Sequence, residues 1–220
     1  GRPAEVRQNA IAVCQTFQTE PITISTMPTQ MGELVVDQLV GDCALRMIFL
    51  GGEKFKRYYD RPYVLVNGYG PTENTVESTL YVVDKPMENI PIGKSILNVR
   101  SYVVDEEMHR VPVGTPGELV HAGRQIARVY HELPEKTAAA FVDNPFATCE
   151  DERRMYRTGD QVRMLGDGNM LYIGRIDHQV KIRGYRVELG EIEGAMLTHD
   201  DIDEVAVIAS DLNGTTHIVG

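Results

Sequence analysis

The sequence is poor in positive charge and contains no long apolar segment. It has 22 Lys and Arg against 32 Asp and Glu, a formal net charge of −10. This balance argues against a nucleic-acid or anionic-membrane partner, because no face can be strongly basic without still stronger acid elsewhere. No apolar run approaches the roughly 20 residues that span a bilayer, and the first ten residues are polar and charged, unlike the apolar core of a secretion signal.

Cysteine is also scarce. Cys14, Cys43 and Cys149 are an odd number at wide, irregular spacing, and no Cys-x-x-Cys pair indicates a zinc site or a redox motif. Free thiols are typical of a reducing compartment, so the sequence predicts a cytoplasmic protein. It shows no internal repeat and no low-complexity segment, and its six histidines are scattered without a pattern that assigns them a function.

The composition is that of an ordinary soluble globular protein. The chain has 220 residues, of which 42% are hydrophobic and 25% charged, so it can bury a core as one large domain or as two small ones. Apolar spacing in the first part predicts, in order, a helix at 4–19, a strand at 22–26, a helix around 31–40, and strands at 45–50 and 63–66. This alternation indicates a parallel α/β layer over residues 1–97, with ligands where strands end and glycine-rich turns begin.

The later part changes character. Short strands at 99–104 and 118–121, separated by turns rich in proline and glycine, predict a small β-structure over residues 98–176, either a distorted barrel or a sheet. Further elements are expected as strands at 169–173 and 179–182, a helix at 190–197, and strands at 204–209 and 216–219. The last of these form a small α/β unit over residues 177–220, and residues 174–177, Gly-Arg-Ile-Asp, are the expected joint.

Four motifs follow one another along the chain. The first is Asn-Gly-Tyr-Gly-Pro-Thr-Glu at 67–73; five fixed residues at about 5% frequency each arise by chance at roughly one position in a million or more. It is followed by Pro-Gly-Glu-Leu at 116–119, Tyr-Arg-Thr-Gly-Asp at 156–160, and Gly-Arg-Ile-Asp-His-Gln-Val-Lys-Ile-Arg-Gly-Tyr-Arg-Val-Glu-Leu-Gly-Glu-Ile-Glu at 174–193. Each alone is an ordinary turn, loop or helix start, but their ordered occurrence is specific.

The series resembles the adenylate-forming superfamily, and residues 174–193 resemble its amino-acid-adenylating branch in non-ribosomal peptide synthetases. The resemblance covers nearly the whole chain. It implies the later part of a large adenylation subdomain, a parallel α/β layer plus a small β-barrel, followed by an incomplete small α/β C-terminal subdomain. It also implies two reaction steps, in which an amino acid and ATP give an aminoacyl-adenylate with Mg²⁺, and the phosphopantetheine thiol of a peptidyl carrier protein then captures the acyl group. A condensation domain in a larger module is a further implied partner.

The motif residues suit this chemistry. Attack of a carboxylate on the α-phosphate brings two anions together, so the site must supply a metal ion, donors and positioning rather than a protein nucleophile. Glu73 is a hard oxygen ligand for Mg²⁺, and Thr72 offers a hydroxyl to the α-phosphate. Tyr69 could cover the adenine face, a contact of about 1–3 kcal/mol. Gly68 and Gly70 would allow the backbone to approach the nucleotide closely.

The resemblance assigns roles to further residues. Asp160 would accept from the ribose hydroxyls, since hydrogen bonds to a charged acceptor are strong. Asp177 would be the hinge of the small domain, and Gly184 would approach the pantetheine arm. Other nucleotide contacts are expected from Gly51, Gly52, Glu53, Asn67, Tyr172 and Arg175.

The amino-acid pocket is expected at Thr26, Phe49, Gly51, Gly68, Val76 and Glu77. Glu77 lies four residues after Glu73, on the same face if a helical turn begins there. A carboxylate inside a closing pocket is costly to bury without a partner, so we predict a long polar or basic substrate such as arginine, ornithine or lysine. The alternative is that Glu77 points to solvent or pairs with a neighbouring protein group.

Three elements of an active relative are not found in the sequence. These are a Ser/Thr/Gly-rich loop ending in Lys-Gly, an Asp that pairs with the substrate's α-amino group, and a near-terminal catalytic Lys. The first two would precede Gly1 and the third would follow Gly220, so we expect a truncated piece of an activating module that is inactive alone and has no catalytic residue of its own. The alternative is a non-catalytic scaffold that binds nucleotide or carrier.

Overall fold

The computed structural model describes residues 8–176, 180–182, 185–199, 201–212 and 215–220. The chain separates into two compact units, residues 1–174 and 175–220, each described here by itself. Both units combine helices with β-sheet, in agreement with the α/β class that the sequence predicts. The finer division at residues 97/98 and 176/177 stays a prediction.

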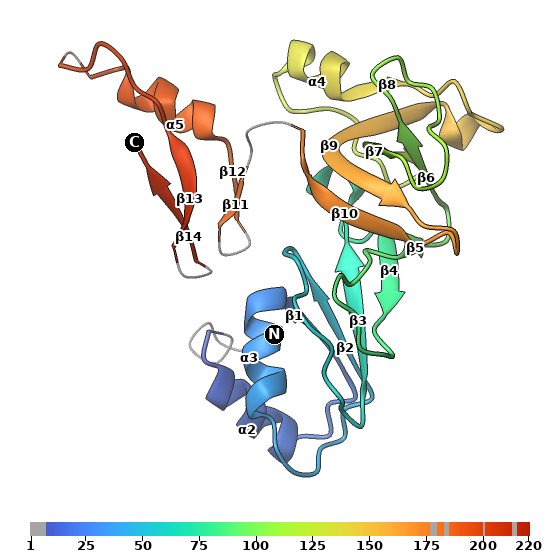
Figure 1. Cartoon of the computed structure of the whole chain (residues 1–220), viewed down its shortest axis with the longest axis vertical. Helices are drawn as coiled ribbons and strands as arrows, with labels where there is room; N and C mark the ends of the chain where they lie inside the picture. Colours follow the sequence, from blue (N-terminus) through green and yellow to red (C-terminus); the bar gives the residue numbers. More distant parts are fainter. Residues whose placement is uncertain (1–7, 177–179, 183–184, 200, 213–214) are drawn as a thin grey trace. The chain divides into compact units, whose positions relative to one another are not determined.

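The first unit begins with a five-stranded sheet (Figure 1). Its order is β1 (Ile24–Pro28), β2 (Met47–Gly51), β3 (Val64–Tyr69), β4 (Thr79–Val82) and β5 (Lys94–Ser95). The first three strands are parallel to one another, as expected of an α/β layer, whereas β4 and β5 add antiparallel pairings that the sequence did not predict. The strands β1 and β3 also continue further than predicted, so Asn67 and Gly68 lie within β3 rather than in a turn.

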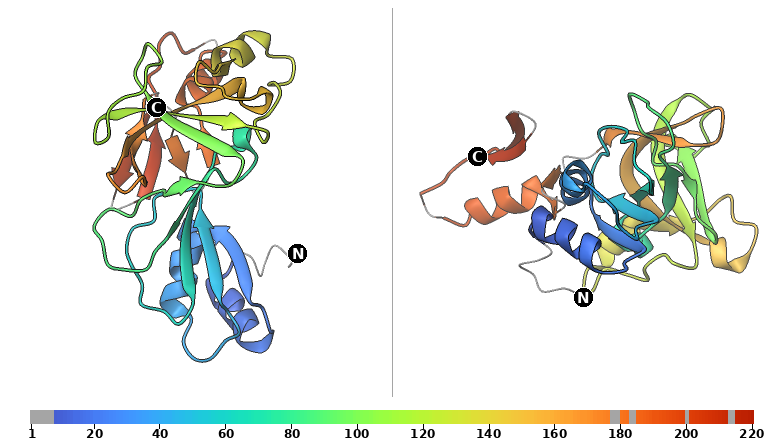
Figure 2. Two further views of the ribbon diagram at one scale, coloured as in Figure 1. Left: turned by 90° about the vertical axis from the view of Figure 1, so that its right-hand side faces the viewer. Right: turned by 90° about the horizontal axis from the view of Figure 1, so that it is seen from below.

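Two helices cover one face of the parallel strands (Figures 1 and 2). Helix α2 (Ala10–Thr19) begins after Asn9, whose side-chain oxygen accepts from the backbone N–H groups of Ile11 and Ala12 and so caps the first turn. Helix α3 (Thr29–Gln38) follows β1 directly. Both predicted helices are present. The start at residue 4 lies outside the described part of the chain, and α3 ends two residues before the predicted limit.

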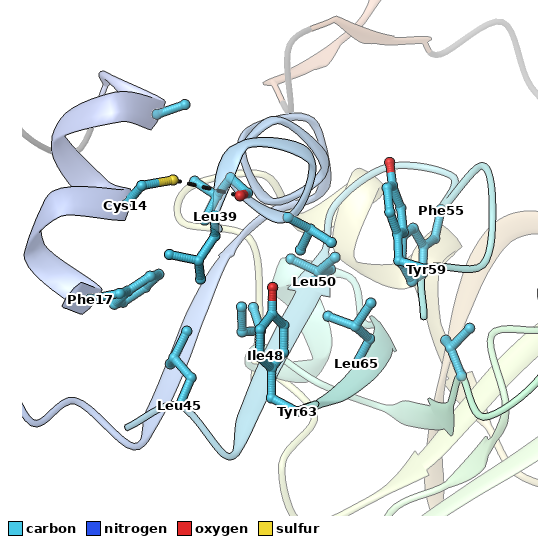
Figure 3. Close-up of a cluster of buried hydrophobic side chains, with 14 of the residues drawn as sticks. Cys14, Phe17, Leu39, Leu45, Ile48, Leu50, Phe55, Tyr59, Tyr63 and Leu65 are labelled. Atoms are coloured by element: carbon cyan, nitrogen blue, oxygen red, sulfur yellow. Dashed lines mark hydrogen bonds between the residues drawn. The ribbon is translucent and has the colours of Figure 1, made fainter. Parts of the chain in front are cut away.

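The core of this layer lies between the helices and the sheet (Figure 3). Because side chains alternate across a strand, Ile48 and Leu50 of β2 face the helices and are fully buried, while Phe49 and Gly51 occupy the opposite face. The Cys14 thiol is buried in the same cluster and donates to the Val35 carbonyl at 3.5 Å. Burial raises the pKa of Cys14, which fits a structural thiol rather than a reactive one.

A second sheet completes the first unit. Its order is β10 (Met170–Arg175), β9 (Arg154–Met164), β7 (Pro116–Gly123) and β6 (Val99–Val104), with β8 (Phe141–Asp143) on β9. Helix α4 (Pro134–Ala140) precedes β8. Of the barrel and the sheet that the sequence allowed, these pairings describe a sheet. Its β10 contacts the segment that leads into β5, since Met170 forms backbone hydrogen bonds with Ile92 and Gly93 at 2.8 and 2.9 Å.

The described part of the second unit contains two antiparallel strand pairs and a helix. The elements are β11 (Val180–Ile182), β12 (Tyr185–Val187), α5 (Leu189–Met196), β13 (Ile208–Leu212) and β14 (Thr215–Val219), with β11–β12 and β13–β14 antiparallel. The predicted helix at 190–197 is confirmed within one residue at each end. The strand expected at 204–209 instead begins at Ile208. Within the described ranges of both units, no helix has the length and apolar character needed to cross a membrane.

Candidate functional site

Tyr69 and Asp160 are in direct contact, although 91 residues separate them. Tyr69 ends β3 of the first sheet, and Asp160 lies in β9 of the second. The Tyr69 hydroxyl donates to Asp160 Oδ2, and the two residues are only 6% and 3% exposed. Burial and the adjacent carboxylate raise the pKa of Tyr69 well above its usual value, so the phenol stays protonated and remains the donor.

The second and third motifs interlock and fix the position of Asp160. The Arg157 guanidinium forms an ion pair with Glu118 at 2.6 Å, and the other oxygen of Glu118 accepts from the Gly159 N–H at 3.1 Å. Thr158 donates to the Leu119 carbonyl at 2.6 Å, and its hydroxyl accepts from the Asp160 N–H at 3.0 Å. The Pro-Gly-Glu-Leu motif therefore holds the strand that carries Asp160.

Two further rings surround Tyr69. The Tyr172 ring, from β10, lies 6.5 Å from the Tyr69 ring between centroids, and the His121 ring, from β7, lies 6.0 Å away. His121 is completely buried, with Nδ1 2.9 Å from the Ser101 hydroxyl, and burial lowers its pKa to about 3. The ring is therefore neutral at physiological pH. The sequence assigned no role to His121, and its strand position between apolar residues gave no sign of this neighbourhood.

Glu73 lies in the short turn that follows Tyr69. The 3₁₀ helix η1 (Thr72–Asn74) places the Glu73 side chain inside the protein, at 8% exposure, whereas Thr72 is exposed. Tyr130 donates its hydroxyl to Glu73 Oε1 at 2.5 Å, and the Ala127 N–H donates to the Glu73 carbonyl at 2.8 Å. Tyr130 was not predicted as a site residue, because nothing in the sequence links it to a position 57 residues earlier.

Two glycines near the end of β3, Gly68 and Gly70, leave space for the chain that returns at Val76 and Glu77. A β-carbon at Gly70 would lie 2.1 Å from the Val76 carbonyl oxygen, so the returning backbone requires glycine there. A β-carbon at Gly68 would lie 2.4 Å from Glu77 Oε2. In this structure the space beside both glycines is therefore filled by Val76 and Glu77, rather than left open for close approach of a nucleotide.

Glu77 lies over the sheet face opposite the helices. Its Oε2 is buried and has no hydrogen-bond partner among the described residues, and burial raises its pKa to about 6. The helical turn that would have aligned it with Glu73 is absent, because η1 ends at Asn74 and the next residue, Thr75, has φ of +71°. Glu77 therefore reaches the sheet through a tight non-helical turn.

The predicted pocket positions on the strands share one face. In the strand register Thr26 lies beside Phe49, and Gly51 lies beside Gly68. Since Phe49 and Gly51 are two residues apart in β2, both pairs occupy the face over which Glu77 lies. Thr26 is exposed and Phe49 is half-buried. Val76, the remaining position, is 67% exposed.

The other predicted nucleotide contacts are placed as follows. The Asn67 side chain is buried and donates to the Pro91 carbonyl at 2.7 Å, so it connects β3 to a neighbouring loop. Gly52, with φ of +94°, and Glu53 follow β2, and the Glu53 carbonyl accepts from the Thr29 hydroxyl at 3.2 Å. Arg175 ends β10 and is the first residue of the second unit. The predicted hinge Asp177 and pantetheine residue Gly184 lie outside the described residues.

Comparisons with known proteins define the class. Bacitracin synthase 1 of Bacillus licheniformis is 44% identical over 205 residues, which are 93% of this chain and 4% of that protein. One solved structure that matches is the holo form of a nonribosomal peptide synthetase protein, which contains adenylation and PCP domains and is bound to a vinylsulfonamide inhibitor. Its TM-score is 0.82 and its sequence identity is 28%. The match covers 96% of this chain and 38% of that one. The crystal structure of a four-domain nonribosomal peptide synthetase bound to AMP and glycine matches with a TM-score of 0.69 and 32% sequence identity. The match covers 99% of this chain and 17% of that one.

The fold is thus that of nonribosomal peptide synthetase adenylation domains, in agreement with the resemblance read from the sequence. The family model described as AMP-binding enzyme matches residues 2–131. The chain belongs to this family of enzymes, and it spans only a small part of the length of the curated relatives it matches.

Proposed function

We propose that this chain contributes to a site that forms an aminoacyl-adenylate from an amino acid and ATP. The observation that carries this proposal is the contact of Tyr69, in the first motif, with Asp160, the last residue of the third motif, which brings together two motifs from two sheets. Glu73 lies four residues further along from Tyr69. The related four-domain synthetase, whose structure holds AMP and glycine, supports the same assignment.

The proposed reaction needs positioning more than covalent chemistry by the protein. A carboxylate oxygen of the amino acid attacks the α-phosphorus, the bond from that phosphorus to the bridging oxygen breaks, and pyrophosphate leaves with the electron pair. Thr72 would donate to the α-phosphate and Asp160 would accept from the ribose. The Tyr69 hydroxyl orients the Asp160 carboxylate, while the Tyr69 ring would pack beside the adenine.

Glu73 is the proposed metal ligand. Mg²⁺ is commonly held by one or two carboxylates together with substrate phosphates, and a buried carboxylate beside the exposed Thr72 hydroxyl fits such a donor set. When bound there, the ion would supply positive charge between the two reacting anions. The protein's part is to hold the Glu73 carboxylate in place, which the Tyr130 hydroxyl does.

Glu77 supports a proposal about the substrate. A buried carboxylate oxygen without a partner among the described residues is costly, and a cationic or hydrogen-bond-donating side chain would satisfy it. The Glu77 side chain itself occupies the space over Gly51 and Gly68, where a β-carbon would lie 3.6 Å from Oε1 and 2.4 Å from Oε2, so the sheet face beneath it holds only glycine and the carboxylate. We therefore propose a long polar or basic amino acid, of the arginine, ornithine or lysine kind.

A second step would transfer the acyl group to a carrier protein. The thiolate of the carrier's phosphopantetheine attacks the acyl carbon, the acyl–oxygen bond breaks, and AMP leaves. Asp177 would be the hinge for this step and Gly184 would lie near the pantetheine arm. The solved relative that contains adenylation and PCP domains supports such a partner, and we place a condensation domain in the same larger module.

The test is amino-acid-dependent ATP–pyrophosphate exchange by the intact module that contains this sequence. Basic and long polar amino acids should support exchange, and Glu77→Gln should reduce it for them, whereas Glu132→Gln, a change at an exposed carboxylate, should not. Preference for valine or leucine, unaffected by Glu77→Gln, would contradict the substrate proposal. Binding of AMP with no exchange for any amino acid would instead favour a non-catalytic scaffold.

The hinge has its own test in the same module. Asp177→Pro fixes φ, so it should slow thioester formation much more than adenylate formation. Both half-reactions can be followed separately, by carrier loading and by pyrophosphate exchange. Equal slowing of the two would count against a hinge at this position.

A further inference from the structure

The loop after β7 is fastened to the turn that carries Glu73 and Glu77. Gln125 makes the first part of this connection: its side-chain Nε2 donates to the carbonyls of Asn74 at 2.9 Å and Glu77 at 2.8 Å. In return, the Thr75 hydroxyl donates to the Gln125 carbonyl at 2.8 Å. One amide side chain therefore holds both ends of the strained segment around Thr75, whose φ is +71°.

Tyr130 and Ala127 make the second part. The Ala127 N–H fixes the Glu73 backbone, and the Tyr130 hydroxyl fixes its carboxylate through Oε1. Burial, followed by the bond to Glu73, raises the pKa of Tyr130, so its hydroxyl remains a donor at physiological pH. The carboxylate is thus held in one orientation by a neutral group that does not cancel its charge.

Tyr130 is itself fixed from outside the turn. Its N–H donates to the Thr137 hydroxyl of α4 at 3.0 Å, and its ring meets the Phe141 ring edge-on at 5.4 Å between centroids. The Lys136 ammonium group lies over the Tyr130 ring, with Nζ 5.5 Å from the centroid of that ring. The phenol is therefore already in place before any ligand binds, as expected of a support for a functional carboxylate.

We propose that the Gln125–Tyr130 segment is the support that positions Glu73 and Glu77, with Tyr130 acting on the metal ligand and Gln125 acting on the amino-acid pocket. Both are positioning residues, and the assignment of what they position depends on the proposed function. Because Tyr130 bonds to the Glu73 side chain whereas Gln125 bonds to the backbone carbonyls of Asn74 and Glu77, their loss has separable consequences. Loss of the Tyr130 hydroxyl removes one hydrogen bond from the Glu73 carboxylate, and loss of Gln125 removes two from the backbone from which Glu77 extends.

Tyr130→Phe in the intact module tests the first half. Hydrogen bonds to charged groups are strong enough that we expect about a tenfold rise in the Mg²⁺ concentration for half-maximal pyrophosphate exchange, with the amino-acid KM unchanged. Tyr102→Phe is the matched control, because that ring packs against Phe146 and, among the described residues, no hydrogen bond joins its hydroxyl to the turn. An unchanged Mg²⁺ requirement, or a rise equal to that of the control, would overturn the role of Tyr130.

Gln125→Ala tests the second half. The loss of two neutral hydrogen bonds should raise the amino-acid KM by about tenfold, while the Mg²⁺ requirement stays within twofold of the wild type. Gln15→Ala, on the exposed side of α2, serves as the control. If both loop variants changed Mg²⁺ requirement and amino-acid KM in the same proportion, the separate roles would be wrong.

Hydrogen exchange on the nucleotide-free protein gives a readout that does not depend on activity. Amides of residues 74–78 should exchange faster in Gln125→Ala and Tyr130→Phe than in the wild type, and Tyr102→Phe should match the wild type. Faster hydrogen exchange in the two loop variants, with no pyrophosphate exchange by the wild type or by any variant, would support the positioning and contradict the proposed function. Unchanged exchange in both loop variants would overturn the positioning itself.

Discussion

Glu77 is a partly buried carboxylate whose ionisation opposes folding. Its carboxylate is half-buried against glycine, one of its oxygens has no partner in the described chain, and its pKa is raised to about 6 from an ordinary value of 4.5. The folded protein therefore takes up the Glu77 proton at a higher pH than the unfolded chain does. The contribution of protonated Glu77 to the free energy of unfolding is fully present below about pH 4.5 and is lost as pH rises through about 6.

Glu77→Gln should consequently stabilise the protein at neutral pH. We expect a gain of about 1 kcal/mol in the free energy of unfolding at pH 8, after allowance for solvent screening of a half-exposed group. At pH 4 the variant and the wild type should be equally stable. Urea denaturation across this pH range measures the difference, and a gap that grew toward low pH would contradict the assigned cause.

A substitution at Tyr69 is expected to lower the stability of the protein, whereas Glu77→Gln should raise it. Tyr69→Phe removes the hydroxyl that donates to the buried Asp160 carboxylate, so we expect a loss of about 1–3 kcal/mol in the free energy of unfolding at pH 7. Tyr81→Phe on β4 is the control, because its hydroxyl forms no hydrogen bond with the part of the chain that the structure describes. Similar losses in the two variants would show that the Asp160 contact is not the cause.

The strands β7 and β9 show why single motifs carry limited information by themselves. The sequence identified Pro-Gly-Glu-Leu and Tyr-Arg-Thr-Gly-Asp separately, but their meaning lies in the contact between them. Glu118 is 7% exposed and bonds to both Arg157 and Gly159, which fixes the strand just before Asp160.

Glu118→Gln tests this connection. Loss of the charge in a largely buried pair should lower the free energy of unfolding by about 2 kcal/mol, less than for a pair in which both partners are fully buried, because Arg157 is partly exposed. The exposed pair Arg124–Asp151 supplies the control, and Asp151→Asn should leave stability unchanged within error. Thermal or urea denaturation would detect the difference, and equal effects of the two changes would argue against a structural role for Glu118.

The sequence predicted the helices and most strands because these follow local patterns of apolar residues. It placed Asn67 and Gly68 in a turn because both residues usually interrupt strands. In the folded chain β3 continues through them, since β4 pairs with its far end and Glu77 occupies the space beside Gly68. The continuation of β3 through Gly68 therefore depends on a residue nine positions away, and a local sequence pattern does not contain that information.

The candidate site was predictable only in part, for a similar reason. Tyr69, Glu73 and Asp160 belong to motifs and could be chosen from the sequence alone. Tyr130 and His121 could not, because their relation to the site arises when separate strands and loops pack together. Asn67 was chosen as a nucleotide contact, yet its amide is engaged with Pro91.

For the whole molecule, the expectation is that this chain by itself binds nucleotide at most weakly. The sequence contains no Ser/Thr/Gly-rich loop ending in Lys-Gly, and positioning supplies most of the rate of such a reaction. Amino-acid-dependent pyrophosphate exchange by the purified 220-residue chain should therefore be absent, with the intact module as the positive control. Robust exchange by the clean chain would show that the residues described here are sufficient.

The central claim is that Asp160, oriented by Tyr69, belongs to the nucleotide part of an aminoacyl-adenylate-forming site. Its most direct test is the ATP dependence of pyrophosphate exchange in the intact module carrying Asp160→Asn, which keeps the shape of the side chain but removes the charge. Loss of a charged acceptor for the ribose predicts about a 10- to 100-fold fall in kcat/KM for ATP, with Asp143→Asn at an exposed position unchanged. An Asp160→Asn variant that folds normally and keeps wild-type kcat/KM for ATP would contradict the account.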